Sequence, residues 1–357
     1  TTLAKLLFRF YDAESGAIRV DGQDLRELDL ASLRNEIGVV PQDTVLFNDT
    51  IAFNIAYGRP EASLEDITAA AEAAAWRPDL YLPVDSPALH LPLARLVRRA
   101  SPATRAVHLV TPQYWGWAPW RVAAYAKAFH LGLSILPFEP RWYARHGVAA
   151  TYVGHPLLDE LAELGVGERA AADQQGAFPA GPLALLPGSR EGVVRRNLPW
   201  MLERVARLQA RPEHAELEVV LPHSRRDLDP VFDELLAASP ARVRRSDAPL
   251  HDELARCRAA FSVSGTVVLD LLPHRLPTVV LYRLKSGRQG WMRDHLLTCP
   301  WFTSVNLLVN DELHPEFAFH GEGPAAEVEQ ALARALGDAA WRAASLAGQE
   351  LAAERVG

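Results

Sequence analysis

Short apolar runs that alternate with amphipathic segments of helical length constrain the fold of this chain more than any other feature. The runs have the size of strands and follow one another as Leu80–Val84, Ala106–Val110, Leu131–Leu136, Ala150–Val153, Leu183–Leu186, Glu218–Leu221, Ala259–Val263 and Val279–Tyr282. Helical patterns such as Pro199–Gln209 and Asp229–Ala238 lie between them. This rhythm is typical of parallel, doubly wound sheets, so we predict an α/β fold.

Composition narrows the possible partners. The chain has 357 residues, and its 37 basic and 44 acidic side chains give a formal net charge of -7. That charge offers no general attraction to nucleic acid, and we predict no nucleic-acid partner. Apolar runs such as Leu131–Phe138 are far shorter than the roughly 20 residues that cross a bilayer. Cys257 and Cys299 lack the spacing of a zinc or redox site, which favours structural thiols in a reducing cytoplasm.

The first 75 residues lack the regular alternation. After a helical pattern at the start, the predicted elements are a strand over Ala17–Val20, a helix over Asp29–Asn35, a strand over Ile37–Val40 and a helix over Ser63–Ala75. Because the alternation begins at Trp76, we predict a domain over residues 1–75. The loop Gly165–Gly181, rich in Ala, Gly, Gln and Asp, predicts a hinge that divides the rest into 76–165 and 166–357. The chain begins at Thr1 without a charged and apolar leader, so we expect no secretory signal peptide.

Two loops that follow apolar strands have the composition of anion sites. After Leu183–Leu186, Pro187 and Gly188 break the strand, Ser189 can cap the next helix and Arg190 stands beside it. After Ala259–Val263, the residues Ser264, Gly265 and Thr266 open a helix, where glycine allows close backbone approach and hydroxyls can bond phosphate. Either loop by itself is better explained by ordinary helix capping. The two together favour a lobe that binds a diphosphate.

Asp85 is a candidate general base. It follows the run Leu80–Val84, so its carboxylate is expected at the carboxyl edge of a sheet, where ligands of open α/β sheets bind. The same residues also read as a helix start, with Ser86 as N-cap and Pro87 at the first helical position. The residues alone favour neither interpretation.

Other polar and aromatic residues have two interpretations each. His155, between a glycine and a proline, is more typical of a hydrogen-bonded turn than of an acid or base. Three tryptophans with one arginine indicate either core packing or the rim of an acyl-chain groove: Trp115, Trp117, Trp120 and Arg121. Three further arginines can face phosphate or solvent: Arg190, Arg195 and Arg196.

A partial family pattern occupies the opening segment. It comprises Thr1–Asp12, Gly16–Gly22, Val39–Asp43, Leu46–Phe47 and Ile51–Gly58. These stretches resemble the nucleotide-binding domain of exporter-type ABC transporters, from the end of the phosphate loop through the Q-loop. The resemblance implies that Thr1 matches the hydroxyl that holds magnesium and Gln42 the Q-loop glutamine. The lysine and glycines of the phosphate loop, the signature motif and the Walker B acids have no match, so we interpret the segment as an incomplete, non-catalytic P-loop ATPase fragment.

A second pattern covers the chain from Trp76 nearly to its end. Its motifs are Pro78–Pro87, Thr111–Trp117, Leu136–Pro140, Val153–Leu157, Leu185–Arg190, Ser264–Thr266 with Asp270, Val280–Arg283, Ser304–Leu308 and Pro315–Phe317. In this order they resemble the lipid-A-disaccharide synthase family, which are two-lobed GT-B glycosyltransferases. The resemblance implies doubly wound, Rossmann-type lobes, with part of the acceptor lobe over 76–165 and the donor lobe with C-terminal helices over 166–357.

The resemblance also implies the reaction. Diacylglucosamine passes from UDP to diacylglucosamine 1-phosphate, with release of UDP, in lipid A biosynthesis. Asp85 takes the role of general base, a task worth about 10²–10⁴-fold in rate. The implied donor-binding residues are Gly188, Ser189, Arg190, Ser264, Gly265, Thr266, Asp270, Tyr282, Arg283, Asn306 and Glu316, the last two in a loop-rich region, and Gln113 and His155 are implied to lie in the cleft. The motifs require no metal or cofactor, and the lipid substrates imply a cytoplasmic protein peripheral on the inner membrane.

The chain departs from this family at several points. Val193 stands where the family usually has Glu, with Glu191 offset by two, and Asp270 replaces a Glu. The family's first strands have no match, so the chain can be an active transferase or an inactive relative. An ABC-type ATPase, or a nucleotide-binding module without catalysis, are the alternatives. We interpret the chain as two unrelated partial sequences joined near Ala75–Trp76, by gene fusion or by an assembly error, rather than as a bifunctional enzyme.

Overall fold

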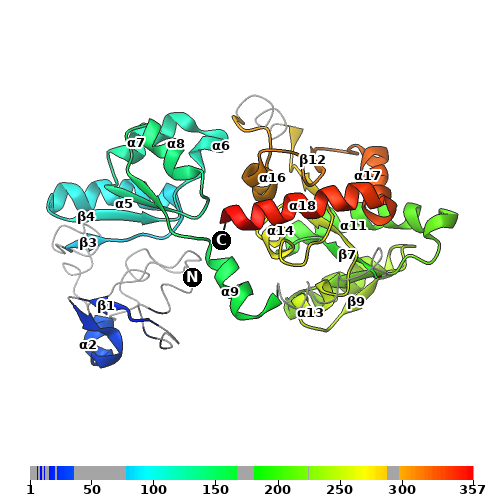
Figure 1. Cartoon of the computed structure of the whole chain (residues 1–357), viewed down its shortest axis with the longest axis horizontal. Coiled ribbons are helices and arrows are strands. Elements are labelled where there is room, and N and C mark those ends of the chain that lie inside the picture. The colour runs from blue at the N-terminus through cyan, green and yellow to red at the C-terminus, as the bar shows by residue number, and fades with distance from the viewer. Residues whose placement is uncertain are drawn as a thin grey trace. The chain divides into compact units, whose positions relative to one another are not determined.

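The computed structural model of the chain describes residues 6, 9, 12, 16–20, 22–35, 78–166, 181–223, 225–287 and 297–356 (Figure 1). They divide into two compact units. The first runs as far as Pro112 and also holds Ala123–Leu133, whereas the second holds Gln113–Val122 and the chain from Ser134 on.

The opening segment contains a small hairpin. Strands β1 (Arg19–Val20) and β2 (Gln23–Asp24) pair antiparallel around Gly22, whose φ of 81° suits glycine. The 3-10 helix η1 (Leu25–Glu27) and helix α2 (Leu30–Asn35) follow. The predicted strand and short helix are therefore confirmed here. The elements predicted over 37–40 and 63–75, together with Thr1, Gln42 and the proposed boundary at residue 76, lie outside the described residues.

A four-stranded sheet follows, in the order β3-β4-β5-β6. Its strands are β3 (Leu80–Tyr81), β4 (Arg105–Leu109), β5 (Leu131–Ser134) and β6 (Ala150–Tyr152). The pairs β3–β4 and β4–β5 are parallel. The helical segments along this stretch are α5 (Pro87–Ala100), α6 (Tyr114–Trp117), η2 (Pro119–Arg121), α7 (Val122–Ala126) and α8 (Glu139–Arg145).

The second unit is built on a six-stranded sheet in the order β12-β11-β10-β7-β8-β9, and every neighbouring pair is parallel. The strands are β7 (Leu183–Leu186), β8 (Val219–Pro222), β9 (Arg244–Ser246), β10 (Ala259–Val263), β11 (Thr278–Arg283) and β12 (Glu316–Phe319). The chain winds outward from β7 in one direction and then from β10 in the other. The strand order therefore reverses between β7 and β10, as in a doubly wound nucleotide-binding sheet, and the predicted α/β class is confirmed.

Helices cover this sheet. They are α9 (Pro156–Glu163), α11 (Glu191–Gln209), α12 (Asp229–Ala237), α13 (Leu250–Leu254), α14 (Val267–Asp270), α16 (Ser304–Val309), α17 (Ala325–Gly337) and α18 (Ala339–Val356), with 3-10 turns η3 (Pro212–His214) and η4 (Arg226–Leu228). The last helix, α18, is red in Figure 1 and packs against α16 and α17. No helix among the residues that the structure describes has the length and apolar character to cross a membrane.

The core of the second unit explains why its central strands read as unbroken apolar runs. Leu183 and Leu185 of β7 point to a layer that includes α11, whereas Ala184 and Leu186 pack on the opposite face with residues such as Leu254. Side chains of a strand alternate between faces, so a strand covered on both sides must be apolar at every position. All residues of β7 and β10 are buried accordingly.

Two features of this unit correct the sequence-based predictions. The helix expected to begin at Pro199 begins at Glu191, and Pro199 lies inside it. The buried face that Val194, Leu198 and Met201 form continues through the proline, and its packing outweighs one missing backbone hydrogen bond. Glu316, expected in a loop-rich region, is the first residue of strand β12.

Candidate donor site and candidate base

The loop after β7 turns sharply at Gly188. Its φ is 109°, and a Cβ at this position would lie 2.7 Å from Val193 Cγ1. Val193, which stands where the resembling family has Glu, therefore packs against the loop. Only glycine fits here without strain, because other residues disfavour both this φ and the contact. The glycine allows the chain to pass from the end of β7 directly into α11.

If Ser189 capped helix α11, the helix would begin at Arg190. It begins instead at Glu191. The N-cap is Arg190, with extended φ and ψ of -112° and 134°, and it makes no side-chain capping bond. The expectation of a Ser189 cap is therefore wrong. The extended conformation that a cap requires falls on Arg190, and its carbonyl accepts hydrogen bonds from Val193 and Val194. A long helix thus starts directly behind the loop without a capping side chain, at the end where a helix attracts anions.

Arg225 supports this loop and has no counterpart among the predicted site residues. Its Nη1 donates to the carbonyl of Ser189 at 3.0 Å, and its Nε and Nη2 donate to Asp227 at 2.8 and 2.6 Å. Arg225 follows β8, the strand beside β7, so its place after a buried strand is the signal that sequence reasoning could have used. Arg195, in contrast, is committed to Glu191 and Glu234 on the surface of α11 and α12.

The second predicted loop follows β10, the other strand at the reversal point. Ser264 N–H continues the sheet by donating to Leu281 O at 2.9 Å, and Gly265 and Thr266 are exposed. Thr266 is the N-cap of α14 without a side-chain capping bond. The structure therefore brings the two predicted anion loops to the carboxyl ends of the two central strands.

Asp270 is the last residue of α14, and its side chain is half-buried. Burial raises the pKa of its carboxyl group, repulsion from Glu160 of α9 adds to this effect, and the two together bring the pKa to about 6. Its proton is therefore held at a pH where an exposed aspartate is ionised.

Asn306 and Glu316 form one hydrogen-bonded network. The Glu316 carboxylate accepts from Phe302 N–H at 2.7 Å, Thr303 N–H at 3.0 Å and Asn306 Nδ2 at 3.1 Å. Asn306 is fully buried, and its amide also exchanges two hydrogen bonds of 2.8 Å with the backbone of His314. Burial raises the pKa of Glu316 despite these donors. Its side chain borders a cavity of about 300 Å³ that Trp301 and Phe302 also line.

Tyr282 and Arg283 lie at the end of β11. Tyr282 is 49% exposed. Arg283 donates to the carbonyl of Arg196 and lies 5.9 Å above the ring of Phe319. Burial lowers the pKa of its guanidinium, and the nearby charge of Arg196 adds to the effect. Arg283 thereby ties the end of β11 to α11.

His155 and Gln113 each begin a helix. His155 is the N-cap of α9, and its Nδ1 accepts a hydrogen bond of 3.3 Å from Leu157 N–H. This is the turn role that its flanking residues predict, and burial lowers the pKa of its ring. Gln113 is exposed and precedes α6 without a side-chain capping bond.

The predicted tryptophan cluster separates into buried and exposed members. Trp115 is 9% exposed and belongs to a core layer with Leu136 and Val268. Trp120 is 60% exposed, and Arg121 lies 4.9 Å above the half-exposed ring of Trp117. Core packing therefore describes Trp115 alone.

Asp85, the predicted base, lies in the first unit with a left-handed backbone. Its φ is 53° and that of Ser86 is 45°. Asp85 N–H donates to Leu109 O at 2.8 Å, and Asp85 O is 2.9 Å from His108 Nε2. Ser86 is the N-cap of α5 and Pro87 its first residue, as predicted, but the hydroxyl makes no capping bond because the backbone is not extended there.

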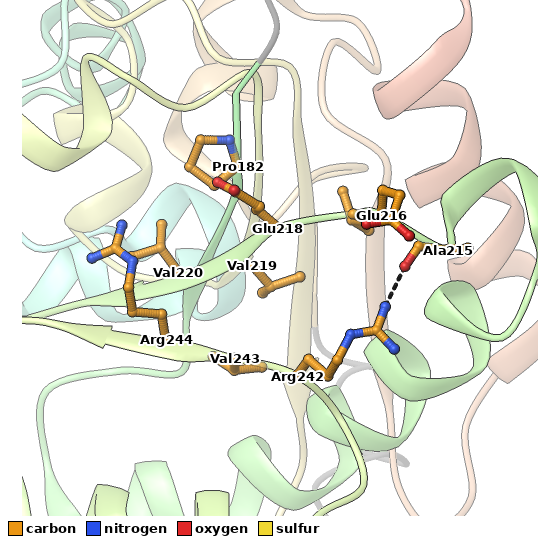
Figure 2. Close-up of a pocket in the computed structure, with 10 residues that line it drawn as sticks. Pro182, Ala215, Glu216, Glu218, Val219, Val220, Arg242, Val243 and Arg244 are labelled. Carbon is orange, nitrogen blue, oxygen red and sulfur yellow. Dashed lines mark hydrogen bonds between the residues drawn. The ribbon is translucent and has the colours of Figure 1, made fainter.

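A cavity of about 490 Å³ lies at the amino ends of strands β7, β8 and β9 (Figure 2). Pro182, Glu218 and Val243 line it, each just before a strand, and Arg242 donates to Ala215 O at its side. Ligands of open α/β sheets bind at the carboxyl ends of strands, so this cavity is not the candidate site. Within the described ranges, no cluster of His, Cys, Asp and Glu is arranged to hold a metal ion.

A doubly wound sheet with glycine-containing loops at both strands of its reversal point is the architecture of many α/β nucleotide-binding proteins. A match to a known family narrows this class to one family. Residues 68–352 match the family described as lipid-A-disaccharide synthetase, and the chain belongs to this family of glycosyltransferases. Residues 1–88 also match the ABC transporter family.

Curated relatives support the assignment. The chain is 33% identical over 277 residues to the lipid-A-disaccharide synthase of Chromohalobacter salexigens, covering 77% of this chain and 70% of that protein. It is 35% identical over 293 residues to the lipid-A-disaccharide synthase of Ruegeria pomeroyi, covering 79% of this chain and 71% of that protein. It is 36% identical over 242 residues to the lipid-A-disaccharide synthase of Pseudomonas fluorescens, covering 67% of this chain and 62% of that protein. The chain thus spans about two thirds of the length of these relatives.

The chain also matches solved structures at low sequence identity. A spinosyn rhamnosyltransferase has a TM-score of 0.43 at 17% identity, covering 85% of this chain and 75% of that one. The UDP-GlcNAc 2-epimerase from Neisseria meningitidis has a TM-score of 0.44 at 11% identity, covering 83% and 82%.

Proposed function

We propose that this chain transfers 2,3-diacylglucosamine from UDP to 2,3-diacylglucosamine 1-phosphate and releases UDP. One observation carries the proposal. The loops at Gly188 and Gly265 follow β7 and β10, the two strands between which the sheet order reverses. That position is where doubly wound sheets bind nucleotides, and membership of the lipid-A-disaccharide synthetase family supports a UDP-linked sugar as the donor.

The proposed donor site lies in the second unit, over residues 166–357. The start of α11, with Arg190, supplies backbone N–H groups and a positive charge for the diphosphate, and Ser264 and Thr266 supply hydroxyl groups. Glu316, Asn306, Tyr282, Arg283 and Asp270 are proposed to shape the rest of the donor site. Gln113 and His155 are proposed to border the cleft of a GT-B arrangement, with part of the acceptor lobe over 76–165.

The proposed chemistry is direct displacement at the sugar. As the acceptor hydroxyl attacks the anomeric carbon, its proton passes to the Asp85 carboxylate. The bond between that carbon and the diphosphate oxygen breaks with its electron pair, so UDP leaves as an anion. Positive and hydrogen-bonding groups around the diphosphate stabilise the charge that develops there.

The acyl chains of both proposed substrates favour a lipid surface as the place of the reaction. We propose that the protein works at the cytoplasmic face of the inner membrane as a peripheral protein. We also propose that residues 1–75 are a non-catalytic remnant of an ABC transporter domain, which the family match over residues 1–88 supports. An ABC-type ATPase would instead show magnesium-dependent binding of ATP.

Thermal unfolding with UDP tests the donor site. At about 100 times its Kd, UDP should raise Tm by about 5 °C or more, and uridine, which lacks the diphosphate, should raise it far less. The double variant Ser264→Ala, Thr266→Ala should reduce the shift. If millimolar UDP leaves Tm unchanged, the donor site is wrong. A shift with magnesium and ATP alone would support the ATPase alternative.

Transfer of radiolabelled diacylglucosamine tests the catalytic role. The full chain should form the disaccharide in mixed micelles, and Asp85→Asn should lower kcat by about 10²-fold or more while the UDP shift persists. Binding of UDP without any transfer would favour the non-catalytic module. Undiminished transfer by Asp85→Asn would exclude this residue as the base.

A further inference from the structure

Residues of strand β4 bind both backbone polar groups of Asp85, its N–H and its carbonyl oxygen. Its N–H donates to Leu109 O at 2.8 Å, and its carbonyl oxygen is 2.9 Å from His108 Nε2. Asp85 and Ser86 are consecutive non-glycine residues with positive φ, a conformation that costs free energy and persists only where its surroundings impose it. The two hydrogen bonds to β4 are contacts that can impose this conformation on Asp85.

The His108 ring is itself firmly held. It is 0% exposed and stacks on Phe129 with ring centroids 4.7 Å apart and an angle of 11°. Tyr125 and His90 contact it at centroid distances of 5.6 and 6.3 Å. The ring therefore presents Nε2 to Asp85 from a fixed position.

The hydrogen bond determines the tautomer of His108. A carbonyl oxygen only accepts hydrogen bonds, so Nε2 must carry the proton. Nδ1 is buried and has no hydrogen-bond partner among the described residues. Burial lowers the pKa of the ring to about 4, which keeps it neutral at physiological pH.

A structural role alone explains this histidine poorly. An apolar ring such as phenylalanine would fill the same space against Phe129 without leaving a buried nitrogen unpaired, which costs stability. What a phenylalanine cannot do is donate a hydrogen bond to Asp85 O.

We propose that His108 is a positioning residue for the candidate base: its Nε2–H holds the carbonyl of Asp85, fixes the left-handed backbone there and thereby sets the direction of the Asp85 carboxylate. This inference rests on the proposed role of Asp85. His108 contacts no substrate in this scheme and acts only through its neighbour.

A pair of substitutions separates positioning from packing. His108→Phe keeps a ring in the core and removes the donor, and we expect kcat to fall about 10- to 100-fold with KM within twofold of the wild type. His108→Gln keeps an N–H donor and should restore part of the rate. His90→Phe is the matched control, because His90 lies in the same cluster but bonds to Tyr81 OH at 2.9 Å, and its kcat should stay near the wild-type value. Wild-type kcat in His108→Phe would overturn the proposal.

A measurement on the full chain that needs no turnover keeps this test separate from the proposed function. In ¹⁵N NMR spectra at neutral pH, His108 should be the Nε2–H tautomer. In His108→Phe, hydrogen exchange at the Asp85 amide should speed up at least tenfold, whereas exchange at the Leu109 amide, which donates to Pro83 O at 2.9 Å, should change little. An Nδ1–H tautomer, or equal acceleration at both amides, would refute the positioning role even if the chain forms no disaccharide. If the exchange result holds while Asp85→Asn retains full transfer, the proposed base fails and the backbone contact stands.

Discussion

The indole Nε1–H of Trp115 donates a hydrogen bond of 3.0 Å to Oε1 of Glu139, a carboxylate that is 1% exposed. The other oxygen, Oε2, accepts from the backbone N–H of Leu136 at 3.1 Å. Through this one side chain, helix α6 is joined to the start of α8. The predicted motifs contained both residues, but their spacing gave no sign that they meet.

Substitution of Glu139 should therefore destabilise the fold. Glu139→Ala leaves two buried donors without a partner, and we expect the free energy of unfolding to fall by about 2–4 kcal/mol. Urea denaturation followed by tryptophan fluorescence measures this change. Glu203→Ala serves as the control, because Glu203 pairs with Arg204 and Arg207 at 53% exposure and should change stability by less than about 0.5 kcal/mol. Equal losses in the two variants would contradict the role of the buried carboxylate.

Two glycines near the donor loop should respond in opposite directions. Gly188→Ala forces a residue into φ of 109° and into contact with Val193, so we expect a loss of about 1–3 kcal/mol and a weaker UDP shift. Gly192 lies in α11 with open space around it, and Gly192→Ala should stabilise by up to about 1 kcal/mol. Chemical denaturation of both variants, with and without UDP, measures these effects. A Gly188→Ala protein as stable as Gly192→Ala would show that the loop does not need glycine.

The pKa of Asp270 predicts a pH dependence of stability. Because the folded state raises this pKa from 3.8 to about 6, the native state binds the proton more tightly than the unfolded chain. Stability therefore falls as pH rises from about 4 to about 6, and the penalty stays constant above that. Asp270→Asn cannot ionise, so it should be more stable than the wild type by about 1–3 kcal/mol at pH 7.5, and the gain should disappear at pH 4. Glu160→Gln should give a smaller gain in stability at pH 7.5. If the gain in stability from Asp270→Asn does not vary with pH, the titration of Asp270 is refuted.

A second carboxylate beside Glu316 should be poorly tolerated. Asn306→Asp replaces a donor, 3.1 Å from the Glu316 carboxylate, with a like charge in a buried position. We expect a loss of about 3 kcal/mol or more at pH 8, partly recovered at pH 5 as one of the two carboxyl groups takes up a proton. Asn310→Asp, at the exposed end of the same helix, should cost less than about 1 kcal/mol at both pH values. Thermal denaturation at the two pH values distinguishes these outcomes, and a pH-independent effect of Asn306→Asp would contradict the pairing.

Sequence patterns recovered the buried strands better than the edge strands. The predicted bounds of Leu183–Leu186 and Ala259–Val263 match β7 and β10, because a strand covered on both faces must be apolar throughout. The edge strands β9 and β12 carry charged residues such as Arg244 and Glu316 and were not predicted. Edge strands often carry charge, and only pairing with a neighbour makes such segments strands.

The α/β class, the central strands and the two glycine-containing loops could be predicted from the sequence, because they depend on short-range apolar periodicity and backbone conformation. The strand order, which sets both loops at the reversal between β7 and β10, depends on how distant strands pair and is visible in the folded structure alone. The folded structure also shows that His108 meets Asp85, that Glu139 meets Trp115 and that Arg225 holds the Ser189 loop. These contacts join residues 23 to 36 positions apart, and no local pattern encodes them, because they arise from the packing of neighbouring strands and helices.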